Sequence, residues 1–218
     1  MSPQAAALIV FLMEMVSAFI SVLVGYYASK AYRSSSAKGL LFLYLGFMIL
    51  GLGIFLRTIT ATYFILVNRV TEIVPSSLAG LSNVAGIVFT LTQIAAYSLF
   101  VLTYVSQSKR IGEQGLRLSG ISAVAAFPVA RLFYIPALEI IAITMLGFVM
   151  LSALVNWLHR RTLNSALVSL GFGLMFFSHI LFLFMLFSEG LLFFGQLSQL
   201  TGFVCLLLML ARVNRANA

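Results

Sequence analysis

The sequence predicts an all-α polytopic membrane protein with seven transmembrane helices. Of its 218 residues, 62% are hydrophobic and only 8% are charged, whereas a soluble domain carries about a quarter charged residues. The mean hydropathy is +1.11, and the apolar residues occur in runs suited to a hydrocarbon core roughly 30 Å thick. Seven such runs leave no room for an extramembrane domain. We therefore expect residues 1–218 to form one transmembrane domain.

The candidate helices follow one another along the chain with short connections. They are residues 5–29, 39–67, 78–105, 118–129, 135–158, 163–187 and 191–210. The first run is longer than the apolar part of a signal peptide and has no basic residue before it, so we expect it to remain as a helix. The fourth is the shortest. Pro128 and Pro136 favour a break between it and the fifth, because proline interrupts a helix.

The basic residues orient this bundle, because ten of the 13 lysines and arginines follow the first, third, fifth and seventh runs. They are Lys30, Arg33, Lys38, Lys109, Arg110, Arg117, Arg160, Arg161, Arg212 and Arg215. By the positive-inside rule the N-terminus is outside and the C-terminus cytoplasmic, and we expect the protein in the cell membrane. An even number of helices would put the C-terminal arginines on the wrong side. The net charge of +8 is thus topogenic, and no nucleic-acid partner is expected.

An internal repeat is indicated by a tripeptide that occurs twice. Leu45-Gly46-Phe47 returns 125 residues later as Leu170-Gly171-Phe172. Glu14 and Glu139 are separated by the same offset, which carries weight because the chain has only five acidic residues. A further likeness, at an offset of 116, joins the third run to the seventh. The alternative explanation is convergence of two segments rich in leucine and glycine.

The repeat predicts a parallel 3+1+3 organisation. The first three-helix unit is residues 1–106, the linker helix lies within residues 107–132, and the second unit is residues 133–218. Both units would start outside, because an odd number of crossings separates their first helices.

Six polar side chains inside the predicted spans are the candidates for function, and all of them lie in the outer halves: Glu14, Arg57, Asn83, Glu139, His179 and Gln199. An ionisable group in hydrocarbon costs at least about 2.5–3.5 kcal/mol on insertion scales. These residues therefore predict a pocket for substrate or protons that is open to the outside, or else a polar core. Arg131 is an interfacial anchor or a charge partner of Glu139.

Each of these residues also has a structural interpretation. Glu14 and Arg57 form either an inter-helix ion pair that fixes the helix register or part of a site. His179 is bonded to a neighbouring carboxylate or carbonyl, or it exchanges protons with Glu139, since histidine titrates near neutrality. The two amide side chains are helix–helix hydrogen bonders unless they line the pocket.

No enzymatic activity, metal or cofactor is expected. Cys205 is the single cysteine, so the chain has no internal disulfide or multi-cysteine metal site. It contains no phosphate-binding loop, HExxH or GxSxG motif. The last lysine, Lys109, lies in a loop, which excludes a retinal Schiff base in the final helix. His159 and His179 belong to opposite halves of the membrane, which argues against a bis-histidine haem.

The N-out, seven-helix, 3+1+3 plan resembles that of the SWEET sugar transporters. In that family a three-helix bundle repeats in parallel around a linker helix, and asparagines of helices three and seven line the site. The resemblance implies that Asn83 and Gln199 line a site here, the second being a glutamine. The family's hinge prolines in helices one and five have no counterpart beyond Pro3 and Pro136. The segment 31–33 (Ala-Tyr-Arg) also resembles small archaeal multi-pass membrane proteins, which implies no activity.

Three functional classes follow from these observations. The first is a secondary transporter for a small polar solute, coupled to protons through Glu14, Glu139 and His179. The second is an accessory or scaffold subunit of a larger membrane complex. The third is a sensor or receptor-like module with an outer ligand pocket. The expected partners are the lipid bilayer and either a small polar solute or another membrane protein, and a homo-oligomer is a further possibility.

Overall fold

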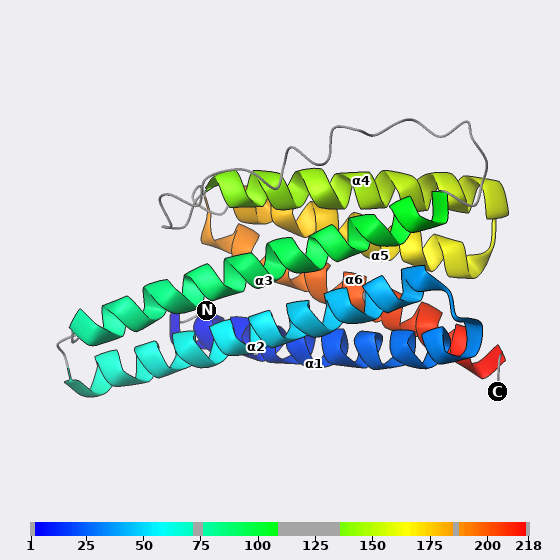
Figure 1. Cartoon of the computed structure of the whole chain (residues 1–218). Coiled ribbons are helices and arrows are strands. Elements are labelled where there is room, and N and C mark those ends of the chain that lie inside the picture. The colour runs from blue at the N-terminus through cyan, green and yellow to red at the C-terminus, as the bar shows by residue number, and fades with distance from the viewer. Residues whose placement is uncertain (1–2, 72–75, 109–135, 185–187, 217–218) are drawn as a thin grey trace.

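The computed structural model describes residues 3–71, 76–108, 136–184 and 188–216, and the described residues form six helices (Figure 1). The helices are α1 (Pro3–Ser35), α2 (Lys38–Thr71), α3 (Ser76–Ser108), α4 (Pro136–Arg160), α5 (Leu163–Leu183) and α6 (Glu189–Ala216). All six are long and apolar enough to cross a membrane. The all-α, multi-pass membrane class is therefore confirmed. The fourth predicted run, residues 118–129, lies outside the described residues.

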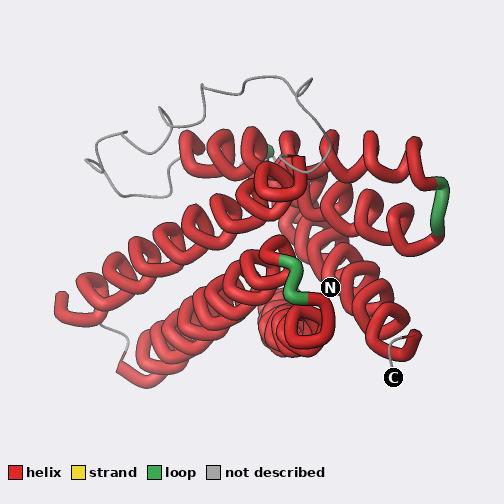
Figure 2. Tube along the Cα trace, turned by 45° about the vertical axis from the view of Figure 1, so that its right-hand side comes forward, coloured by secondary structure: helices red, strands yellow, loops and turns green. Residues whose placement is uncertain are grey.

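The six helices close into a ring. Each helix packs against its neighbours in the order α1, α2, α3, α4, α5, α6, and α6 returns to α1. Figure 2 shows the same helices in a view turned by 45°. Four of the helices, α1, α3, α4 and α6, run in one direction, and α2 and α5 run in the other (Figure 1). The end of α3 and the start of α4 consequently lie at opposite ends of the bundle.

Two tight connections, α1 to α2 and α4 to α5, have the same backbone geometry. Ser36 and Arg161 follow the helix ends with φ angles of 55° and 49°, in the left-handed region. Each donates its N–H to the carbonyl four residues earlier, at 2.7 Å in both cases, which closes the helix by a single hydrogen bond. A non-glycine residue in this region costs roughly 1–2 kcal/mol. The two residues are 125 positions apart, the offset of the repeated tripeptide.

An aromatic layer fills the centre of the ring. Phe47 lies 4.6 Å from Phe100 and 5.9 Å from Phe203 between ring centroids, and Phe100 lies 5.6 Å from Phe172. All four side chains are at most 1% exposed. They come from α2, α3, α5 and α6, so they join helices that are not neighbours in the ring. Phe47 and Phe172 are the last residues of the repeated tripeptide.

The glycine of each tripeptide allows a close helix crossing. A Cβ at Gly46 would collide with the Phe100 ring and lie 3.2 Å from the Ala96 carbonyl oxygen. A Cβ at Gly171 would lie 2.7 Å from Leu206 Cγ and 3.0 Å from the carbonyl oxygen of the residue four positions earlier. The partners of Gly46 in α3 are Ala96 and Phe100. Those of Gly171 in α6, Gly202 and Leu206, lie 106 residues later in the chain.

The packing therefore relates α3 to α6 at an offset of 106, and the offset of 116 taken from the sequence differs from it. The difference is 10 residues, which turns the face of a helix by about 80°. The two registers therefore bring different residues of α3 and α6 into correspondence. At the offset of 106, Gln199 corresponds to Gln93 and not to Asn83.

Adding a methyl group at the α2–α3 crossing should destabilise the protein. We expect Gly46→Ala to cost about 1–3 kcal/mol, as overpacking does in a filled core, because the buried Phe100 ring has no space to move. Thermal unfolding in detergent, followed by the fluorescence of Trp157, should show a melting temperature lower by several degrees. Gly86→Ala is the matched control, since nothing lies within 4 Å of its added Cβ. Equal melting temperatures for the two variants would contradict this packing.

Candidate functional site

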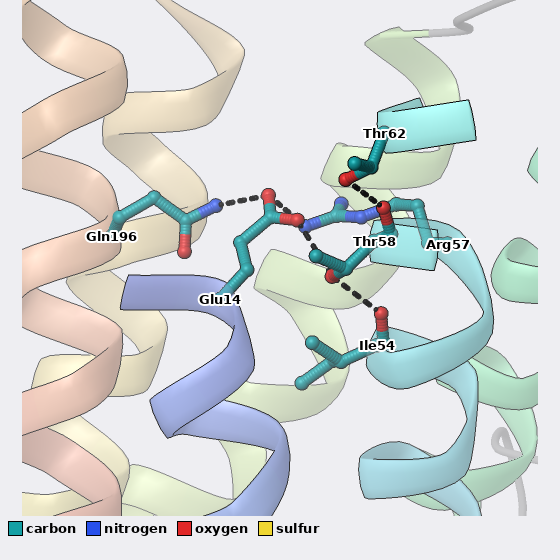
Figure 3. Close-up of polar contacts among 6 residues, drawn as sticks. All are labelled: Glu14, Ile54, Arg57, Thr58, Thr62 and Gln196. Atoms are coloured by element: carbon teal, nitrogen blue, oxygen red, sulfur yellow. Dashed lines mark hydrogen bonds and ion pairs between the residues drawn. The ribbon is translucent and has the colours of Figure 1, made fainter. Parts of the chain in front are cut away.

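The first polar network surrounds Glu14 of α1. Its Oε1 accepts hydrogen bonds from Arg57 Nη2 at 2.6 Å and from Gln196 Nε2 at 3.0 Å. Its Oε2 lies 2.9 Å from the hydroxyl of Thr58, which is also 2.7 Å from the carbonyl oxygen of Ile54. Figure 3 shows the carboxylate between the two donors of α2 and the amide of α6. The network thus ties three helices together, and the expected ion pair between Glu14 and Arg57 is present.

The charge of Arg57 is compensated twice. Its guanidinium Cζ lies 4.1 Å from the centroid of the Phe89 ring in α3, within the range of a cation–π interaction. The Arg57 side chain is 33% exposed and that of Glu14 is 14% exposed. Arginine is protonated at every physiological pH. Glu14 therefore faces a permanent positive charge.

The second polar network is a chain of three titratable side chains. Glu139 Oε2 in α4 lies 2.6 Å from His179 Nδ1 in α5. On the other side of the imidazole ring, His179 Nε2 lies 2.6 Å from the Tyr97 hydroxyl in α3. The amide of Gln93, one turn earlier in α3, donates to the same hydroxyl oxygen at 3.3 Å. His179 and Tyr97 are each 1% exposed, and the Glu139 side chain is 17% exposed.

Hydrogen-bonding chemistry assigns the donors in this chain. An ionised Glu139 can only accept, so His179 Nδ1 carries a hydrogen, and the Nε2 of the neutral ring then accepts from the Tyr97 hydroxyl. Every hydrogen points towards Glu139 in this arrangement. The three side chains are therefore joined in one continuous hydrogen-bonded chain. If Glu139 carries a proton and donates it, His179 Nδ1 must be the acceptor, and the hydrogen of the neutral imidazole then lies on Nε2.

The two networks have the same plan. In each, a carboxylate from the first helix of one half contacts the second helix of that half, and the third helix of the other half completes the network. Glu14 of α1 contacts α2 and α6. Glu139 of α4 contacts α5, and His179 carries the connection to α3. Side-chain bonds thus cross between the halves on both sides of the ring.

One face of α3 connects the two networks. Phe89, Gln93 and Tyr97 are spaced by four residues, so they lie along one stripe of the helix. Arg57 stacks on the first of them, and His179 contacts the other two at 3.4 Å and 2.6 Å. Sequence reasoning missed Gln93 and Tyr97. Their four-residue spacing was the available signal, but neither side chain is charged.

The other predicted site residues stand apart from these networks. Gln199 is 6% exposed in α6 and belongs to neither network within the described residues. Asn83 lies in α3, but its side chain is outside the described part of the structure, as is all of Arg131. Sequence reasoning also missed Thr58 and Gln196, the uncharged partners of Glu14. The buried Oε1 of Gln196 has no hydrogen-bond partner in the described part of the chain.

No protein-family model, curated protein or solved structure matches this chain. Within residues 3–71, 76–108, 136–184 and 188–216, no group of three or more His, Cys, Asp or Glu side chains could hold a metal ion.

Removing either partner of the Glu14–Arg57 pair should destabilise the protein more than removing both. Glu14→Gln and Arg57→Gln each leave an uncompensated charge in the membrane, whereas the double variant leaves none. We expect a coupling energy of about 0.5–3 kcal/mol, in the lower half of that range because Arg57 is one-third exposed. Unfolding in mixed micelles with increasing denaturing detergent measures the four proteins of the cycle. Strictly additive losses would argue against the pair. Arg160→Gln, at an exposed helix end, is the control.

Proposed function

We propose that this protein is a proton-coupled secondary transporter for a small polar solute. The observation that supports this best is the hydrogen-bonded chain of Glu139, His179 and Tyr97 inside three apolar helices. Ionisable groups in membrane spans are costly and commonly serve ion or proton pathways. A packing role alone would need none of the three to titrate. Glu139 is the accessible end of the chain, and the buried Tyr97 is its closed end.

The proposed topology has seven crossings with the N-terminus outside. It is supported by the parallel directions of α3 and α4 (Figure 1), because a connection between opposite ends of the bundle must pass the membrane once more. The described basic residues support the orientation: all of them except Arg57 and Arg69 lie at the end where α1 and α6 finish. They are Lys30, Arg33, Lys38, Arg160, Arg161, Arg212 and Arg215. The cell membrane is the proposed location.

We also propose that the two halves are a parallel repeat, as in the 3+1+3 plan of the SWEET transporters. The support comes from three pairs of residues at one offset: the two carboxylates, the two crossing glycines and the two left-handed connection residues Ser36 and Arg161. Parallel repeats in transporters can move against one another around a fixed site. The proposed solute site lies between the networks.

The arrangement of layers along the bundle fits an outward-facing state in which the aromatic layer closes the path towards the basic end. Phe47 precedes Arg57 by 10 residues in α2, and Phe172 precedes His179 by seven residues in α5, so the aromatic layer lies about 10–15 Å nearer the basic end. In this proposal, a solute reaches the polar layer from outside and the aromatic layer blocks it below. Transport then requires the four phenylalanines to separate.

A scaffold subunit of a membrane complex is the second candidate. It is favoured by the Glu14 network, in which both carboxylate oxygens are bonded and three helices are fixed. Such a network is suited to rigidity. Under this alternative, the Glu139–His179 pair also serves only to hold helices together.

Removing the hydroxyl of Tyr97 should uncouple transport from protons. Proteoliposomes with an imposed acid-outside gradient are first screened with labelled sugars, amino acids and small organic acids. For the solute that accumulates, we expect Tyr97→Phe to lower proton-driven uptake at least tenfold, because the chain then ends at His179. Tyr104→Phe is the matched control, since this tyrosine also lies in α3 against Phe172 but outside the chain. It should stay within twofold of the native protein.

A change at Glu139 should separate coupling from solute binding. We expect Glu139→Gln to abolish proton-driven accumulation while solute exchange without a gradient stays within about threefold of the native rate, because the glutamine still accepts a hydrogen bond but cannot titrate. If exchange and accumulation fall together while folding is intact, the carboxylate is not the coupling group. If no solute accumulates and stoichiometric proteins accompany the purified chain, the scaffold interpretation replaces transport.

A further inference from the structure

A continuous groove runs along the outer surface of the α1–α2 pair, away from both polar networks. Its part near the helix ends has a volume of about 510 Å³, and its part nearer the middle has about 470 Å³. Val22 and Met48 line both parts, so the two are joined. Gly51 and Val22 line the groove at a place where α1 and α2 pack closely, since a Cβ on Gly51 would lie 3.1 Å from Val22 Cγ2.

The two parts of the groove differ in chemistry. Lys30 and Arg33 line the part near the helix ends, together with the hydroxyl-bearing Tyr26 and Ser29. The middle part is lined by apolar residues alone, and Phe19 is 65% exposed there. No ion pair involves either cation among the described residues. The groove therefore offers two unpaired positive charges at one end and an exposed apolar channel at the other.

Its dimensions match one leaflet of a bilayer. Lys30 and Phe19 are 11 residues apart in α1, which corresponds to about 16 Å along a helix. This is close to half of a hydrocarbon core roughly 30 Å thick. The cations lie at the end of α1, where the helix leaves its apolar stretch and lipid headgroups are found. Basic pockets between transmembrane helices at this depth bind anionic headgroups.

We propose that this groove is a specific site for a two-chain phospholipid with an anionic headgroup. The phosphate pairs with Lys30 and Arg33, and an acyl chain lies between the helices over Val22 and Gly51. Charge complementarity and the apolar continuation of the groove select this occupant over a second copy of the chain, whose same surface would bring two pairs of like charges together. The site is independent of any transport activity.

Lipid retention tests the proposal. The full chain is reconstituted in nanodiscs of equal phosphatidylglycerol and phosphatidylcholine, then released and weighed by native mass spectrometry. We expect bound phosphatidylglycerol to exceed phosphatidylcholine at least fivefold in the native protein. The double variant Lys30→Gln/Arg33→Gln should bring that ratio close to one. Arg160→Gln/Arg161→Gln, which removes the same charge at the same end of other helices, should leave the ratio unchanged.

A second variant tests the apolar part without changing charge. Val22→Phe fills the channel, and we expect it to lower lipid retention at least threefold while the melting temperature changes little. The proposal is overturned if the native protein shows no preference between the two lipids, or if both double variants lose the preference equally. It is also overturned if Val22→Phe retains lipid at the native level, or if the native protein is a dimer without bound lipid.

Discussion

The need to neutralise two carboxylates inside an apolar bundle constrains the rest of this structure. Glu14 and Glu139 lie in helices that otherwise suit hydrocarbon, where an uncompensated charge costs several kcal/mol. Neither helix supplies its own partner. The partners come from α2 and α6 for Glu14, and from α5 and α3 for Glu139. Satisfying these two charges therefore requires the ring of helices to close at both places where the first three helices meet the last three, between α1 and α6 and between α3 and α4.

The polar bonds between the helices explain why the aromatic layer can consist of one residue type. Because polar bonds fix which helix faces which, the layer beneath them needs only to fill volume. Phenylalanines from four helices do this with ring contacts of 4.6–5.9 Å. Gly46 sets how near α2 approaches α3, and Gly171 sets how near α5 approaches α6. Each glycine is followed by a phenylalanine that lies in the aromatic layer. Polar groups thus supply specificity in one layer, and aromatic packing supplies closure in the next.

The sequence was sufficient for the helices and insufficient for the networks. Hydropathy located six spans within a few residues of their observed bounds, since a membrane leaves the backbone little alternative to a helix. The scarcity of charge also singled out Glu14, Arg57, Glu139 and His179, which the structure brings together in two pairs.

The uncharged partners could not be found in the same way. Gln93 and Tyr97 are uncharged, and their four-residue spacing shows only that they share a face of α3. Their role depends on which face of α3 meets α5. Asn83 was selected from the sequence by its place near the outer end of its predicted span, and Gln93 lies ten residues further along the same helix. Register is a property of packing, and packing glycines such as Gly46 and Gly171 reveal it only once their partners are known.

The difference between the two networks is more informative than their likeness. Glu14 faces an arginine and two neutral donors. Glu139 faces a histidine and, behind it, a phenol. Within the described residues, the Glu14 network contains one ion pair and joins α1, α2 and α6, while the Glu139 network joins α4, α5 and α3 through a histidine. One difference of residue type, arginine against histidine as the partner of the carboxylate, therefore distinguishes two networks that otherwise share a plan.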